Sequence, residues 1–148
     1  MERFIRYNML LFRGIIKNSP NEKLNGTMFY GRMFTYNAKG GIDIWSELSC
    51  YEVDPNTLEV FVGNYKTIPI WEGDIIHIKT ENVDKDFGVV TWHEDGYFYV
   101  DDSFGEFPKD RCKPIGDFVE DISRDFDAEI YVNGNIHERP EVREQKSK

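Results

Sequence analysis

The alternation of apolar and polar positions along the chain predicts short β-strands separated by turns. Runs rich in aromatic and β-branched residues recur, and Gly, Asn, Asp and Pro stand between them. This pattern is typical of a mostly-β domain. We expect strands over residues 9–16, 27–35, 42–45, 51–53, 58–62 and 129–132, with the Gly63-Asn64 pair ending the strand at 58–62.

The clearest strand pair is a hairpin in residues 88–100, GVVTWHEDGYFYV. Its loop has either two residues, Asp95-Gly96, or three, Glu94-Asp95-Gly96. The longer loop pairs His93 with Tyr97 and gathers one apolar face, formed by Val90, Trp92, Phe98 and Val100. Because a slip of one residue exchanges the two faces, burial of this apolar set favours the three-residue loop. The outer face then carries Thr91, His93, Tyr97 and Tyr99.

Residues 115–126 are the one segment with helical periodicity. Apolar residues recur there at helical spacing, at Ile115, Phe118, Val119, Ile122 and Phe126. Asp117 near the start suits the positive end of the helix dipole. We therefore predict a short helix, followed by the last strand, a turn at Gly134 and a frayed tail over residues 143–148.

Two turns carry residues whose roles can be read from their chemistry. Pro55 fixes φ at a turn corner, and Asp54 before it can accept backbone N–H bonds. In WEGD, residues 71–74, the two carboxylates suggest either an acidic active-site corner or a bend before a strand. Gly73 supplies backbone freedom and Asp74 can accept bonds from the turn's own amides, so we predict a structural turn.

Net charge is unevenly distributed over the 148 residues. Residues 1–45 carry seven Lys/Arg and three Asp/Glu, a net +4, whereas the remainder carries 11 and 24, a net −13. An acidic majority disfavours a phosphate backbone, so we expect no direct binding of nucleic acid. The basic third and the acidic remainder suit contacts between copies in a homo-oligomer, and the acidic part also suits occupation of a host protein.

The residues able to do chemistry form no recognisable constellation. Cys50 and Cys112 make no CxxC pair, and the three histidines are far apart, so we predict no metal site and no cofactor. Neither a nucleophile elbow nor a phosphate-binding glycine loop occurs. Clustered carboxylates, such as Asp84 with Asp86, leave a small metal-dependent hydrolase or nuclease as an alternative. No stretch resembles a secretory signal or a membrane span, so the expected location is the cytoplasm.

Six segments, in this order, resemble motifs of the YopX family of phage and prophage proteins. They are LFRG at 11–14, FYG at 29–31, YEVDPNTL at 51–58, WEGDII at 71–76, GVVTW at 88–92 and GNIHERPEV at 134–142. Two departures stand out. The stretch EVFVGNYKTIPI replaces a more polar hairpin of the family, and Arg139 stands where the family commonly has Asn.

The resemblance implies a single domain over residues 1–148. It would comprise a β-rich part at 1–66, a part at 67–142 with an SH3-like small barrel around EGDI, and the tail. It also implies a phage or prophage origin and a ring-like homo-oligomer, and it supplies no catalytic residue. We therefore predict a non-enzymatic binding or assembly module. The alternatives are an acidic anti-defence or host-takeover inhibitor and the metal-dependent hydrolase. The predicted binding surface is His93, Tyr97 and Tyr99.

Overall fold

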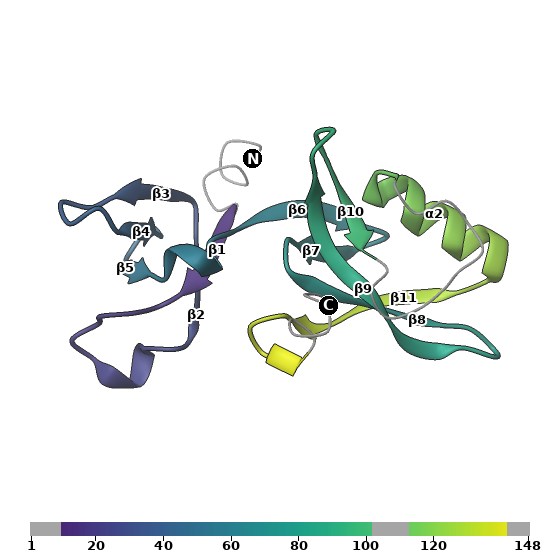
Figure 1. Ribbon diagram of the computed structural model, residues 1–148, viewed down its shortest axis with the longest axis horizontal. Coiled ribbons are helices and arrows are strands. Elements are labelled where there is room, and N and C mark those ends of the chain that lie inside the picture. The colour runs from purple at the N-terminus through teal and green to yellow at the C-terminus, as the bar shows by residue number, and fades with distance from the viewer. Residues whose placement is uncertain (1–9, 102–112, 142–148) are drawn as a thin grey trace. The chain divides into compact units, whose positions relative to one another are not determined.

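The computed structural model describes residues 10–101 and 113–141. The chain forms two compact units, Met1–Phe61 and Val62–Lys148. The predicted mostly-β class is confirmed, because antiparallel sheets dominate the described residues, with one longer helix among them (Figure 1). The division falls within strand β6 (Glu59–Tyr65), a few residues before the boundary predicted at 66. The SH3-like barrel stays a prediction. No helix among the described residues is long and apolar enough to cross a membrane.

The first unit contains two small antiparallel arrangements of strands. β1 (Phe12–Ile15) pairs with β2 (Met28–Gly31) and with the start of β6. β3 (Met33–Tyr36), β4 (Ile42–Trp45) and β5 (Cys50–Val53) form the other sheet. The 3-10 helices η1 (Glu22–Leu24) and η2 (Pro55–Thr57) lie in the connections. The core consists of Ile42, Ile44 and Val53, with Phe12, Phe29, Phe34 and Leu58 packed against it.

A buried ion pair joins two of these strands. Arg13 and Glu59 are direct partners in the register of β1 and β6. Arg13 Nε lies 2.9 Å from Glu59 Oε1, and the two side chains are only 4% and 6% exposed. Because a buried charge is costly without its counter-charge, each residue depends on the other for its stability.

The predicted strand over residues 27–35 is wrong, because the chain bends at Gly31 and Arg32 and forms two strands. A Cβ on Gly31 would lie 2.4 Å from Ile44 Cγ2 and 2.5 Å from the Trp45 carbonyl oxygen. Glycine is therefore required where this bend closes on β4. The Arg32 amide donates to Trp45 O at 2.8 Å. The predicted end of the strand at Gly63-Asn64 is also wrong, since β6 continues to Tyr65.

The second unit is built on one four-stranded antiparallel sheet. Its order is β10 (Tyr97–Asp101), β9 (Asp84–His93), β8 (Asp74–Lys79) and β11 (Glu129–Asn135). β7 (Ile68–Trp71) precedes β8 and pairs with β6. Helix α2 (Ile115–Phe126) packs its apolar side chains into the main core. The members that share this core include Ile70, Ile76, Ile78, Phe87, Val90, Val100, Phe118, Val119 and Ile122.

The helix was predicted with its correct boundaries, and the hairpin with its correct loop and register, although β9 begins at Asp84, four residues before the predicted start. Tyr97 pairs with His93 and Phe98 with Trp92, and Gly96 has φ +99°, as the three-residue loop requires. Val90 and Val100 are buried as expected, but Trp92 is 53% exposed, so its predicted burial is wrong. Trp92 lies toward the end of the hairpin, beyond the part that the core covers. β11 extends three residues past the predicted strand, with an irregularity between Val132 and Asn135.

Candidate functional site

The turn between β7 and β8 is held by contacts to its own backbone. Gly73 has φ +85°, and Asp74 Oδ2 accepts a hydrogen bond from the Trp71 amide at 2.8 Å. Asp74 is only 3% exposed. The Gly73 amide donates to Val90 O, and its carbonyl accepts from the Ile136 amide. Asp74 therefore closes the turn that connects β7 with the central strand β8.

The other predicted turn residues also have backbone roles. Asp54 Oδ1 accepts from the Asn56 amide at 3.0 Å, and Pro55 begins η2. Gly134 has φ +77°, and a Cβ there would lie 3.2 Å from Glu138 Oε2. These residues determine the path of the backbone at turns.

Replacing Asp74 by alanine is expected to lower the free energy of unfolding by about 1–3 kcal/mol, the cost of leaving a buried donor unsatisfied. The Trp71 amide would lose its acceptor while staying enclosed. Urea unfolding followed by circular dichroism measures the change. Asp74→Asn, which retains a side-chain carbonyl, should recover part of the loss. An unchanged unfolding midpoint in Asp74→Ala would contradict the structural role.

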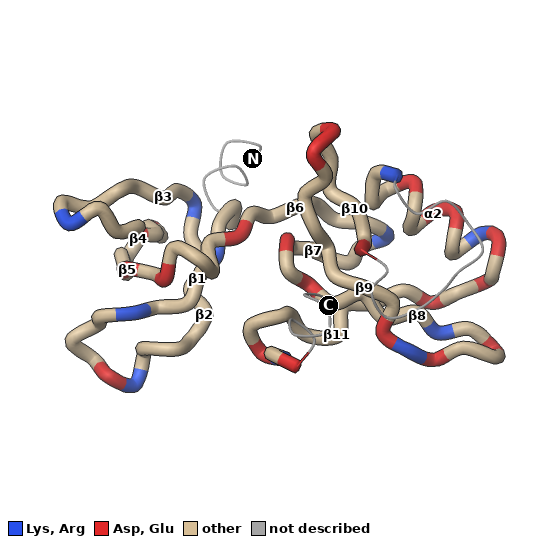
Figure 2. Tube along the Cα trace, viewed as in Figure 1, with Lys and Arg blue, Asp and Glu red and all other residues tan. Residues whose placement is uncertain are grey.

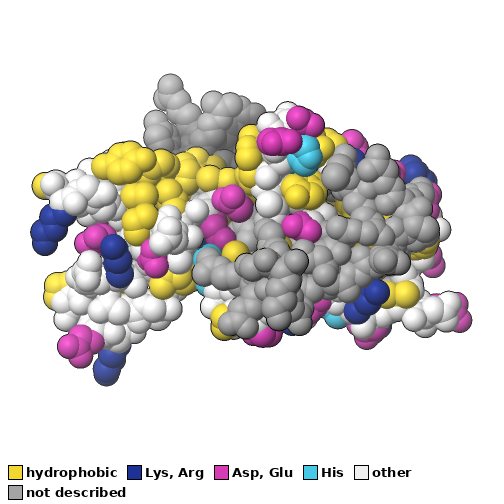
Figure 3. Space-filling model, viewed as in Figure 1, with side chains coloured by type: hydrophobic (Ala, Val, Ile, Leu, Met, Phe, Trp, Pro, Cys, Tyr) yellow, Lys and Arg dark blue, Asp and Glu magenta, His cyan; other side chains and the backbone are white. Residues whose placement is uncertain are grey.

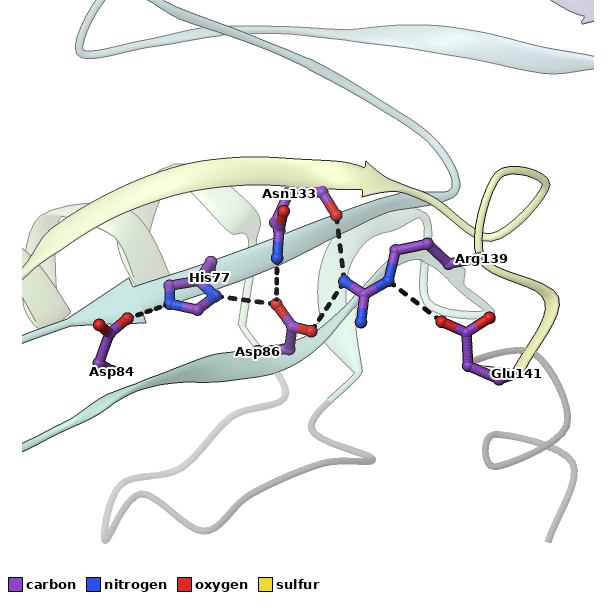
Figure 4. Close-up of polar contacts among 6 residues, drawn as sticks. All are labelled: His77, Asp84, Asp86, Asn133, Arg139 and Glu141. Atoms are coloured by element: carbon purple, nitrogen blue, oxygen red, sulfur yellow. Dashed lines mark hydrogen bonds and ion pairs between the residues drawn. The ribbon is translucent and has the colours of Figure 1, made fainter.

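A group of interacting polar side chains lies on β8, β9, β11 and the segment that follows β11 (Figure 4). His77 on β8 stands between two carboxylates: Nε2 lies 2.5 Å from Asp84 Oδ1, and Nδ1 lies 2.9 Å from Asp86 Oδ1. Asp86 also accepts from Asn133 Nδ2 at 3.0 Å and pairs with Arg139 Nη1 at 2.8 Å. We call these five residues the His77 network.

Further contacts of the same group hold its two ends. Arg139 Nη1 donates to Asn133 O at 3.2 Å, and its Nε donates to Glu141 Oε1 at 3.4 Å. The His77 ring stacks on Tyr131 with ring centroids 4.7 Å apart. The network therefore joins β8 and β9 to β11 and to the segment that follows it.

The pKa values of the two central groups of the network, His77 and Asp86, shift in opposite directions. Burial alone would lower the pKa of His77, but hydrogen bonds and charge interactions with Asp84 and Asp86 outweigh it and raise the pKa above 6.5. Burial would raise the pKa of Asp86, but hydrogen bonds from Asn133, His77 and Arg139 lower it below 3.8. Both shifts favour the charged forms, a protonated imidazole and an ionised carboxylate.

The contribution of His77 to stability is expected to depend on pH. A group whose pKa is raised by folding stabilises fully below its unfolded value of 6.5, and this stabilisation is lost as the pH rises through the folded value. The difference in unfolding free energy between the wild type and His77→Gln should therefore be largest in mild acid and shrink in alkali. Urea titrations at several pH values measure it. Asp86→Asn should weaken the same pH dependence, and a difference constant with pH would contradict the assignment.

The His77 network was not predicted from the sequence, although the sequence contains one signal of it. Apolar and polar residues alternate along β8, so His77 and Lys79 lie on the face opposite Ile76 and Ile78, which are fully buried. Pairing of β8 with β9 brings His77 opposite Asp86 and Lys79 opposite Asp84. A hairpin prediction for residues 74–93 would have brought these groups together.

The predicted surface of His93, Tyr97 and Tyr99 is brought together on the outer face of the β9–β10 hairpin. The His93 and Tyr97 rings stack with centroids 4.6 Å apart and an angle of 6° between their planes, and Tyr99 meets His93 edge-on at 5.2 Å. His93 Nδ1 accepts from the Asp95 amide at 3.0 Å. These contacts form a small aromatic surface beside an acidic turn. Its role in binding stays a prediction.

Large apolar side chains are also exposed in the first unit. Met33, Tyr36 and Trp45 are 49%, 73% and 42% exposed, and Leu48 at the β4–β5 turn is 96% exposed. Figure 3 shows hydrophobic side chains gathered over β3. Cys50 on β5 pairs with Trp45 on β4 and is a half-buried free thiol. Cys112 lies outside the described residues.

Within residues 10–101 and 113–141, no group of three or more His, Cys, Asp and Glu side chains could hold a metal ion. Asp84 and Asp86, the carboxylates that suggested a metal-dependent enzyme, contact His77 instead. Comparison of the chain with protein-family models, with curated proteins and with solved structures finds no match.

Proposed function

We propose that this protein is a non-enzymatic binding and assembly module of the YopX type, encoded by a phage or prophage and acting in the bacterial cytoplasm. The observation that carries the proposal is the exposure of large apolar side chains on strands of a strongly charged chain. Tyr36 and Trp45 in the first unit and Trp92 in the second are each more than two-fifths exposed, at 73%, 42% and 53%. Clusters of exposed apolar side chains mark surfaces that meet other proteins.

The polar groups support a binding role over a catalytic one. His77, Asp84 and Asp86 contact each other, and Asp74 closes a turn. A general base or nucleophile needs a free site beside it for the reacting atom. These side chains are instead engaged in joining strands to one another.

Light scattering over a wide range of protein concentrations tests the assembly function. We expect a homo-oligomer, present either at every protein concentration or in a fraction that rises with the protein concentration. A strictly monomeric species at the highest concentration would refute self-assembly.

A second candidate function, an acidic inhibitor that occupies a host protein, is favoured by the distribution of charge between the units. Residues 62–148 carry 11 Lys/Arg and 20 Asp/Glu, a net −9, whereas residues 1–61 carry seven of each. In Figure 2 acidic positions recur along α2 and at the β9–β10 turn. Exposed acidic side chains on α2 include Asp117, Glu120 and Asp125.

An affinity experiment on bacterial lysate separates the two functions. An inhibitor of this kind is expected to retain one host protein at low salt and to release it as the salt concentration rises, because surface charges are screened. Recovery of this chain alone, with no salt-sensitive host protein, would count against inhibition and leave self-assembly.

A further inference from the structure

We propose that the edge strand β3 is the surface through which two copies of this chain pair, in an antiparallel arrangement centred on Thr35. This inference rests on the proposed assembly function and names the contact that would serve it. It starts from the position of β3, which has β4 as its one neighbour in the sheet β3-β4-β5 within the described part of the chain.

The outward-facing backbone groups of β3 follow from the hairpin geometry. The Asn37 amide donates to Gly41 O at 2.8 Å, so the N–H of Asn37 points toward β4. N–H and C=O groups alternate in direction along a strand. The N–H and C=O groups of Phe34 and Tyr36 consequently point away from β4, toward the open edge of the sheet.

The side chains of β3 lack the features that usually protect an edge. Its sequence is Met-Phe-Thr-Tyr, without a charge or a proline. Natural proteins commonly protect exposed edges with lysine, proline or bulges, because an unprotected edge is a template for another strand. Tyr36, at the end of β3, is 73% exposed. An added strand would cover its ring and satisfy the outward backbone groups.

A second copy of β3 fits this edge better than an unrelated strand would. In a two-fold antiparallel pair centred on Thr35, Phe34 of each copy lies opposite Tyr36 of the other. The backbone N–H and C=O groups of both residues are then hydrogen-bonded to the other copy. Phe34 already contacts Tyr36 within one chain edge-on, with ring centroids 6.1 Å apart, and the pairing adds a second aromatic contact across the two-fold axis.

Charge also favours pairing through the first unit. Residues 1–61 carry equal numbers of Lys/Arg and Asp/Glu, whereas residues 62–148 carry a net −9. Two copies that meet through their first units bring together units without net charge, whereas contact between two second units would oppose like charges. An antiparallel β3–β3 contact therefore avoids the like-charge repulsion that a contact between two second units would meet.

Disulfide trapping tests the register directly. At the proposed centre, Thr35 and its copy form a non-hydrogen-bonded pair, with Cα atoms about 4.5 Å apart, which suits a disulfide. With Cys50→Ser and Cys112→Ser as background, Thr35→Cys should form a covalent dimer under mild oxidation. Leu48→Cys, in the β4–β5 turn away from the edge, is the control; it should crosslink far less although Leu48 is 96% exposed and Thr35 is half-buried.

A second variant tests the backbone contact. Tyr36→Pro removes an N–H that faces the open edge, a position where a strand tolerates proline. Light scattering should show a shift toward monomer, while circular dichroism shows that the fold is retained. Tyr36→Lys should give the same shift by adding a charge to the edge.

The outcomes separate the pairing from the assembly function. Preferential crosslinking of Thr35→Cys together with dissociation of Tyr36→Pro supports the β3 contact. Crosslinking no better than that of Leu48→Cys, in a protein that still forms oligomers, overturns the β3 contact and leaves assembly through another surface. A wild type that is monomeric at every concentration overturns both.

Discussion

Gly88→Ala is expected to prevent the second unit from folding stably. A Cβ at this position would lie 1.6 Å from the Asp101 carbonyl oxygen and 2.5 Å from its carbon, far inside any tolerated contact. Because the obstacle is backbone, no side-chain rotation can relieve it. We expect a loss of several kcal/mol, at or above the roughly 4–5 kcal/mol that marks an exceptional point mutation.

The location of Gly88 explains why this clash would spread. Gly88 pairs with Ile76 on β8, and its neighbour Val89 pairs with Asp101 on β10. β9 is therefore held on both sides here, so moving β10 away to admit a methyl group would break the sheet next to buried Val89 and Val90.

Expression level, near-ultraviolet circular dichroism and thermal melting measure the effect. Gly116→Ala, in the first turn of α2, is the matched control. A Cβ there would meet the Tyr65 ring carbon Cε1 at 3.1 Å, a side chain able to shift, and alanine favours a helix by about 0.5–1 kcal/mol. A Gly88→Ala protein that melts like the wild type would show that β10 does not approach β9 as described.

Glu59→Ala is expected to produce the second largest effect, a loss of about 3–5 kcal/mol, because it leaves the buried Arg13 guanidinium without its carboxylate. Both side chains are almost fully enclosed, and Arg13 Nε donates to Glu59 Oε1 at 2.9 Å. Glu59→Gln retains an acceptor oxygen but not the charge, so its loss should lie between those of Glu59→Ala and the wild type.

The double variant Arg13→Met with Glu59→Leu tests whether the loss comes from the unpaired buried charge. Replacing both members of a buried ion pair by apolar residues is often neutral or stabilising. The double variant should therefore be more stable than Glu59→Ala or Arg13→Met alone, as measured by urea unfolding. Losses that simply add would show that the two side chains act independently.

The sequence predicted those elements whose signals are local. The helix over residues 115–126 is signalled by the helical spacing of its apolar residues. The hairpin is signalled by a glycine at the loop position with positive φ. Asp54 and Asp74 each accept a hydrogen bond from a backbone amide of their own turn. Each signal acts over a few residues, so a single stretch of sequence contains it. The mostly-β class follows from the same local patterns.

The parts that the sequence did not reveal depend on contacts between distant segments. In the sequence, Gly31 is one glycine within an aromatic run. The need for glycine at the bend between β2 and β3 follows from the close approach of β4, which the sequence of this segment does not show. The His77 network joins positions on β8, β9, β11 and the segment after β11. Trp92 follows the pattern of its buried neighbours, yet the core ends before it.

The place of β11 in the sheet has a consequence for the order in which the second unit completes its structure. β8 lies between β9 and β11, and β11 is separated from it in the sequence by the hairpin and by α2. During synthesis on the ribosome, β8 can pair with β9 early, but its other edge stays open until residues 129–135 have emerged. Ile130 and Val132 then add to the core that α2 shares. The nascent chain therefore passes through a stage with an exposed edge on its central strand, when association with other chains is most favourable.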